Sequence, residues 1–81
     1  MNEIRNSLSL DTVNLQTFIT VADKLSFSQA ATTLHITQSA VSKRILALES
    51  ELGVRLFDRI GRQIQLTETG HFFLNKAHLV L

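Results

Sequence analysis

Residues 26–53 read SFSQAATTLHITQSAVSKRILALESELG and predict two helices joined by a tight turn. Ser26, followed three residues later by Gln29, forms the capping-box pattern that starts a helix. Thr37 offers a second N-cap close behind, so the first of these two helices must be short. Two helices with so short a connection are typical of a helix-turn-helix, which we place at 27–46.

The second of these helices is expected to run from 38 to 52, because Gly53 supplies the left-handed residue that commonly follows a helix. Its expected buried stripe consists of Val41, Ile45, Leu48 and Leu52. The opposite face carries Ser39, Ala40, Ser42, Lys43 and Ala47. Small residues let a helix approach base edges, serine and lysine donate hydrogen bonds, and Gln38 suits bidentate pairing with adenine. An ordinary solvent-exposed helix face has a similar composition, so this pattern alone leaves both interpretations open.

Upstream of this stretch, the sequence predicts a polar arm and one amphipathic helix. Asp11 is the expected N-cap of a helix over 12–24. Apolar residues recur there with helical spacing at Leu15, Phe18, Ile19, Ala22 and Leu25. Residues 1–10 are mostly polar, and we expect them to form a flexible arm.

Downstream of Gly53 the pattern changes from helical spacing to alternation. Apolar residues alternate with glutamines after a turn at Gly61, which predicts a two-stranded hairpin within 55–66. Added to three helices, this hairpin gives a mainly α fold, a winged helix-turn-helix over 11–66. Arg59 and Arg62 lie on the wing, where they would meet the DNA backbone or minor groove. The alternative is that they merely keep an exposed turn soluble.

A fourth helix, the linker helix over 67–81, is expected to start at the Thr67 cap. Its apolar residues spread over more than one face: Phe72, Phe73, Leu74, Ala77, Leu79, Val80 and Leu81. A helix docked on a small domain buries only one face, so we expect a second copy of the chain to cover the other. Antiparallel pairing of two linker helices would give a homodimer with two recognition helices at a fixed spacing. Because the sequence stops on apolar residues, we expect it to be a piece of a longer protein.

The composition excludes several classes of protein. The 81 residues include no cysteine, which rules out disulfides, Cys-ligated zinc and thiol catalysis in this chain. No apolar run approaches the ~20 residues of a membrane span, and we expect a cytoplasmic protein without membrane contact. The formal net charge is only +1, yet residues 37–66 hold five Lys or Arg against three acidic residues. This uneven distribution is a weak indication of nucleic-acid binding.

An enzyme is the first alternative function, because Glu68-x-x-His71 resembles half of a metal site in helical bundles. The sequence lacks the second half and the common nucleophile, phosphate-loop and dinucleotide motifs. We therefore expect neither catalysis nor a bound metal. A winged domain that binds another protein instead of DNA is the second alternative. Absence of any affinity for duplex DNA at low salt would favour it.

Five groups of residues occur in a fixed order and spacing. They are Leu15-x-x-Phe18-x-x-Val21-Ala22, Ser26-Phe27-Ser28-x-Ala30-Ala31-x-x-Leu34, Gln38-Ser39-Ala40-Val41-Ser42, Leu48-Glu49-x-Glu51-Leu52-Gly53-Val54-x-Leu56-Phe57-Asp58-Arg59 and Leu66-Thr67-Glu68-x-Gly70. Over about residues 12–74 the chain closely resembles the N-terminal DNA-binding domain of LysR-type transcriptional regulators. It departs from the usual pattern at Leu25, Ser39 and Thr69, where family members commonly have glycine, proline and alanine.

The resemblance implies a winged helix-turn-helix that binds double-stranded promoter DNA as a homodimer through the linker helix. For the full-length protein it also implies higher oligomers and a C-terminal domain that binds a small inducer; no cofactor is expected in this chain. Matched positions give the expected DNA-binding residues Ser28, Thr37, Gln38, Ser39, Ala40, Ser42, Lys43, Arg59 and Arg62. Ser28 would contact phosphate, the residues of the recognition helix would face the major groove, and the two arginines would belong to the wing.

Overall fold

The computed structural model describes residues 11–80 and is mainly helical. Its helices are α2 (Thr12–Lys24), α3 (Phe27–Leu34), α4 (Gln38–Leu52) and α5 (Glu68–Val80), and its strands are β1 (Phe57–Ile60) and β2 (Gln63–Leu66). The predicted winged helix-turn-helix, with three helices, a two-stranded wing and a following helix, is confirmed. The predicted arm at 1–10, Leu81 and the side chain of Val80 lie outside the described part of the chain.

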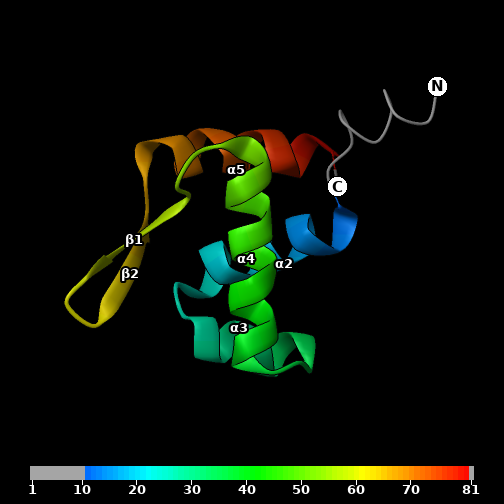
Figure 1. Ribbon diagram of the computed structural model, residues 1–81, viewed down its shortest axis with the longest axis vertical. Coiled ribbons are helices and arrows are strands. Elements are labelled where there is room, and N and C mark those ends of the chain that lie inside the picture. The colour runs from blue at the N-terminus through cyan, green and yellow to red at the C-terminus, as the bar shows by residue number, and fades with distance from the viewer. Residues whose placement is uncertain (1–10, 81) are drawn as a thin grey trace.

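Helices α2, α3 and α4 enclose one hydrophobic core, and α4 crosses in front of the other two in Figure 1. Phe18 of α2 and both Val41 and Leu48 of α4 have no exposed surface. Leu56, which immediately precedes β1, is also fully buried and closes the core on the side of the wing. Burying a side chain of this size contributes about 1.5–3 kcal/mol, so these contacts determine how α4 sits on the domain.

Side-chain caps determine where the first three helices begin. Asp11, Ser26 and Thr37 each accept a hydrogen bond from a backbone N–H in the first turn of their helix, at 2.8, 3.1 and 3.0 Å. A cap of this kind stabilises a helix by about 1 kcal/mol. All three caps were predicted from the sequence, and the starts of α2, α3 and α4 follow from them.

Left-handed residues end the same three helices. Leu25 ends α2 with a φ of 50°, His35 ends α3 with 59°, and Gly53 ends α4 with 72°. For a residue with a Cβ atom, this conformation costs roughly 1–2 kcal/mol. Leu25 occupies the position at which the resemblance led us to expect glycine, and its left-handed backbone explains that preference physically.

The hairpin projects away from the helices, as Figure 1 shows. Its strands pair antiparallel, with Phe57 opposite Leu66 and Ile60 opposite Gln63. Gly61 forms the turn with a φ of 64°. Exposure rises steeply along β1, from 5% at Phe57 to 59% at Ile60. The hairpin is therefore part of the core at one end and surrounded by solvent at the other.

Helix α5 packs against α2, and some of its apolar residues lie against the core while others are exposed to solvent. Phe73 and Leu74 pack against the core, and Ala77 is only 1% exposed. Phe72 and Leu79, in contrast, are 64% and 82% exposed. The exposed apolar surface of α5 is therefore narrower than the sequence suggested, because Phe73, Leu74 and Ala77 cover the helix's own domain.

Candidate nucleic-acid interface

The N-terminal half of α4 presents the residues expected at the major groove on one side of the helix. Gln38, Ser39 and Lys43 are exposed, whereas Ala40 and Ser42 are half-buried. The opposite side is packed into the core, with exposures of 0–3% for Val41, Ile45 and Leu48. The structure thus places these five predicted residues outside the buried stripe of α4, with Ala40 and Ser42 partly covered by the rest of the domain.

The start of α3 lies beside the wing. Ser28, the expected phosphate contact, is exposed in the first turn of α3. The neighbouring Phe27 ring lies under the Arg59 guanidinium, whose central carbon is 5.5 Å from the ring centroid. Such a cation–π contact at an exposed site is worth about 0.5–1 kcal/mol. Arg59 is therefore held against the start of α3 rather than extending freely from the wing.

Besides Arg59, two more of the five basic residues in 37–66 make polar contacts within the domain. Arg44 donates a hydrogen bond to Thr17 Oγ1 of α2 at 3.2 Å. Arg55 donates to the Phe57 carbonyl at 3.1 Å and lies 4.0 Å from the Asp58 carboxylate. Arg55 is nevertheless exposed, as are Lys43, Arg59 and Arg62, whereas Arg44 is half-buried.

A cleft of about 150 Å³ separates the recognition helix from the wing. Ser42 and Leu46 line it from α4, Phe27 from α3, and Arg59 and Ile64 from the wing. Leu46 is 63% exposed, so the outer side of α4 is not wholly polar. The two walls that would face DNA are thus separate elements, and their relative orientation depends on how the wing is attached.

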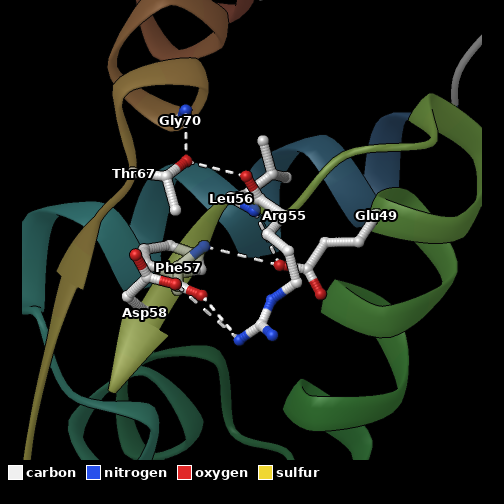
Figure 2. Close-up of polar contacts among 7 residues, drawn as sticks. All are labelled: Glu49, Arg55, Leu56, Phe57, Asp58, Thr67 and Gly70. Atoms are coloured by element: carbon white, nitrogen blue, oxygen red, sulfur yellow. Dashed lines mark hydrogen bonds and ion pairs between the residues drawn. The ribbon is translucent and has the colours of Figure 1, made fainter. Parts of the chain in front are cut away.

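One attachment comes from a carboxylate of α4, shown in Figure 2. Glu49 Oε2 accepts a hydrogen bond from the backbone N–H of Leu56 at 2.7 Å and a longer one from Phe57 at 3.4 Å. Glu49 is half-buried at this point, between the recognition helix and the start of β1. No sequence pattern indicates this role for Glu49; its only signal is its place in the fourth group of residues that resemble the LysR family.

The second attachment comes from the start of α5, also visible in Figure 2. Thr67 Oγ1 donates a hydrogen bond to the Arg55 carbonyl at 2.7 Å and accepts one from Gly70 N–H at 2.8 Å. Thr67 N–H donates to the Leu56 carbonyl at 3.0 Å. A Cβ atom at Gly70 would overlap that same carbonyl oxygen. The predicted cap at Thr67 therefore also connects α5 to the chain entering the wing.

Comparison with known proteins agrees with this geometry. The family model described as bacterial regulatory helix-turn-helix protein, lysR family, matches residues 13–71. The chain belongs to the LysR family. A curated relative from Azotobacter vinelandii, an uncharacterized HTH-type transcriptional regulator in the ibpB-leuC intergenic region, is 54% identical over 72 residues. That alignment covers 89% of this chain and 50% of the relative.

Other LysR-type relatives are much longer than this chain. The transcriptional regulator CfxR from Cupriavidus necator is 48% identical over 67 residues, which are 83% of this chain and 21% of CfxR. The chain thus spans half or less of the length of these curated relatives.

Solved structures of LysR-type domains have the same fold. The DNA-binding domain of CbnR, crystallised in complex with DNA, superposes with a TM-score of 0.83 at 38% identity, covering 88% of this chain and 82% of that one. The BenM domain in complex with catB site 1 DNA gives 0.83 at 37% identity, covering 88% and 80%. This LysR-type domain therefore has the winged helix-turn-helix found in DNA-bound regulators.

Two further findings concern other kinds of site. Among the helices of residues 11–80, none combines the length and apolar character that a membrane crossing requires. Over the same described residues, His, Asp and Glu side chains form no group of three close enough to bind a metal ion. Glu68 and His71, the pair considered as half of a metal site, both lie exposed on α5.

Proposed function

We propose that this chain is the DNA-binding domain of a bacterial LysR-type regulator and binds promoter DNA in a sequence-specific manner. The observation that carries this proposal is that α4 buries Val41, Ile45 and Leu48 in the core, while small and hydrogen-bonding residues lie on its other side, exposed or half-buried. Helices with such a face enter the major groove, where each base pair presents a distinct pattern of donors and acceptors. The likeness to the CbnR and BenM domains supports this assignment.

Each predicted contact residue has a role in this proposal. Gln38 and Ser42 read base edges, Ser39 and Ala40 let the helix approach closely, and Lys43 binds phosphate. Thr37 holds the start of the recognition helix through its hydrogen bond to the first turn. The wing and the start of α3 contact the DNA backbone or minor groove through Ser28, Arg59 and Arg62.

The test is a selection of bound sequences from random duplexes, followed by binding titrations with the selected half-site. Gln38→Ala and Ser42→Ala are expected to lose preference for that half-site, because a good bidentate base contact contributes about 1–3 kcal/mol of discrimination. Ser50→Ala, at an exposed position near the other end of α4, is the matched control and keeps the preference. Unchanged preference in both test variants, or no duplex affinity at low salt, would contradict the proposal.

We further propose that α5 mediates a homodimer. Phe72 and Leu79 are seven residues apart, lie on one side of α5 and are both largely exposed. Antiparallel pairing with a second α5 would cover both residues and set two recognition helices for a two-fold symmetric operator. In sedimentation, a Phe72→Glu, Leu79→Glu variant should be monomeric and His71→Glu dimeric. A monomeric wild type at high micromolar concentration, or a dimeric double variant, would contradict this.

For the whole protein, the family assignment supports three further proposals. A C-terminal domain outside this sequence binds a small inducer and promotes higher oligomers. The protein acts in the cytoplasm, where its promoter is. It carries out no catalysis, and this domain uses no cofactor. Selective binding of duplexes by this chain alone, without any added small molecule, would support the proposal that this domain uses no cofactor.

A further inference from the structure

We propose that Glu49 is a positioning residue that fixes the orientation of the wing relative to the recognition helix. This inference rests on the proposed DNA-binding function and assigns to one carboxylate of α4 a part in it that involves no contact with DNA. Glu49 acts through β1: it holds the strand from which Arg59 extends, so that wing and recognition helix meet one duplex together.

The contacts of Glu49 suit this role. Its carboxylate accepts hydrogen bonds from two consecutive backbone N–H groups, those of Leu56 and Phe57, at 2.7 and 3.4 Å. Both residues are almost completely buried, at 0% and 5% exposure, so these N–H groups have little access to water. Hydrogen bonds to a charged acceptor are stronger than those between neutral groups. The junction between α4 and the wing is therefore held at the residue where β1 begins.

The hairpin needs such a hold because it has only two strands. An isolated two-stranded hairpin is marginally stable, so outside contacts must determine its direction. Its strands have four residues each, which at about 3.3 Å per residue makes an arm of roughly 13 Å. A rotation of about 20° at the base would move the tip of such an arm by roughly 4 Å. A displacement of that size exceeds the length tolerance of a hydrogen bond to phosphate.

An ordinary acidic residue beside a DNA surface would have the opposite effect. Without a positioning role, the negative charge of Glu49 would only repel phosphates, and its removal would strengthen binding. If Glu49 orients the wing, its removal weakens binding although the charge becomes more favourable. The two interpretations thus differ in the sign of the expected change.

The first experiment measures duplex binding by the 81-residue chain as a function of salt, for Glu49→Ala, Glu49→Gln and Glu51→Ala. Glu51 is exposed on the same helix and controls for the loss of one negative charge. We expect Glu49→Ala to bind more weakly than wild type, with a log–log salt slope less steep by ~0.9 for each lost phosphate contact. Glu49→Gln, which keeps an acceptor oxygen, should recover most of the loss, and Glu51→Ala should bind as tightly as wild type or more tightly.

These measurements separate positioning from general destabilisation. A less stable but correctly folded domain would lose apparent affinity without a change in salt slope. The preference for the selected half-site should persist in Glu49→Ala, because α4 still reads the bases. Equal or tighter binding by Glu49→Ala, or an unchanged salt slope, would overturn the inference.

The second experiment needs no DNA and keeps failure of the inference distinct from failure of the proposed function. Amide hydrogen exchange is followed at Leu56 and Phe57 in the free chain. In Glu49→Ala we expect exchange at both amides to accelerate by tenfold or more, and in Glu51→Ala to stay as in wild type. Unchanged protection in Glu49→Ala would overturn the inference and leave the proposed function intact. A wild type without duplex preference would instead overturn the proposed function.

Discussion

The two ends of the wing differ in what holds them. At the wing base, formed by Leu56, Phe57 and Thr67, the chain is buried or half-buried and is bonded to both α4 and α5. At the wing tip, formed by residues 60–63, every residue is exposed. The base therefore determines the stability and direction of the hairpin, while the tip is free to carry charge. Substitutions at the wing base should therefore affect mainly the stability of the fold, and substitutions at the wing tip should affect only DNA binding.

The largest expected effect is at the base, in Gly70→Ala. A Cβ atom there would overlap the Leu56 carbonyl oxygen, which is backbone and cannot move aside like a flexible side chain. We expect the free energy of unfolding to fall by about 2–3 kcal/mol in chemical denaturation.

The matched glycine at the tip has open space around it. Gly61 has nothing within 4 Å of a built Cβ, but its φ is +64°. Gly61→Ala should therefore cost only about 1 kcal/mol, from the left-handed backbone. If Gly61→Ala and Gly70→Ala lowered the free energy of unfolding equally, steric crowding at the wing base would not be what makes Gly70 necessary.

Thr67→Val is expected to have the next largest effect on stability. The substitution keeps the shape of the side chain but removes the donor to the Arg55 carbonyl and the acceptor for Gly70 N–H. We expect a loss of about 1–2 kcal/mol in the free energy of unfolding. Thr69→Val, at an exposed position on the same helix, should stay within about 0.5 kcal/mol of wild type. A Thr67→Ser variant as unstable as Thr67→Val would mean that the hydroxyl is not what matters.

The parts of the fold that depend on local contacts could be predicted from the sequence. The caps Asp11, Ser26 and Thr37 act on backbone groups within three residues, and the starts of α2, α3 and α4 follow from them. The left-handed end at Gly53 is local in the same way. These elements could be predicted because each depends on residue type and spacing alone.

Contacts between elements could not be predicted in the same way. Glu49 bonds to residues beyond the end of its own helix, and nothing in its spacing distinguishes it from Glu51. Phe72 and Phe73 are equally apolar, and only the docking of α5 decides that Phe73 packs against the core while Phe72 stays exposed. Arg44 counted toward the basic segment, yet it bonds to α2. Predicting which residues make such contacts requires knowing how whole helices and strands pack together, and the spacing of apolar residues does not show this.

Between base and tip, Arg59→Ala should affect both stability and binding. Its guanidinium stacks on Phe27 at 5.5 Å, a contact worth about 0.5–1 kcal/mol at an exposed site. A double-mutant cycle with Phe27→Leu, measured by denaturation, should give a coupling energy of that size. If the two substitutions changed the free energy of unfolding additively, the stacking contact with Phe27 would not be what holds Arg59 near α3.

The smallest expected effect on folding is at the tip, in Arg62→Ala. Arg62 follows the turn residue Gly61 and is exposed, so the free energy of unfolding should change by no more than about 0.5 kcal/mol. Its charge should still matter for DNA, since each lost phosphate contact lowers the log–log salt slope by ~0.9 and weakens binding to all sequences alike. Gln63→Ala, a neutral change at the neighbouring exposed position, is the control and should leave the slope unchanged. An Arg62→Ala variant with the wild-type slope would mean that the tip does not reach the duplex, and that only the base and the middle of the wing take part in binding.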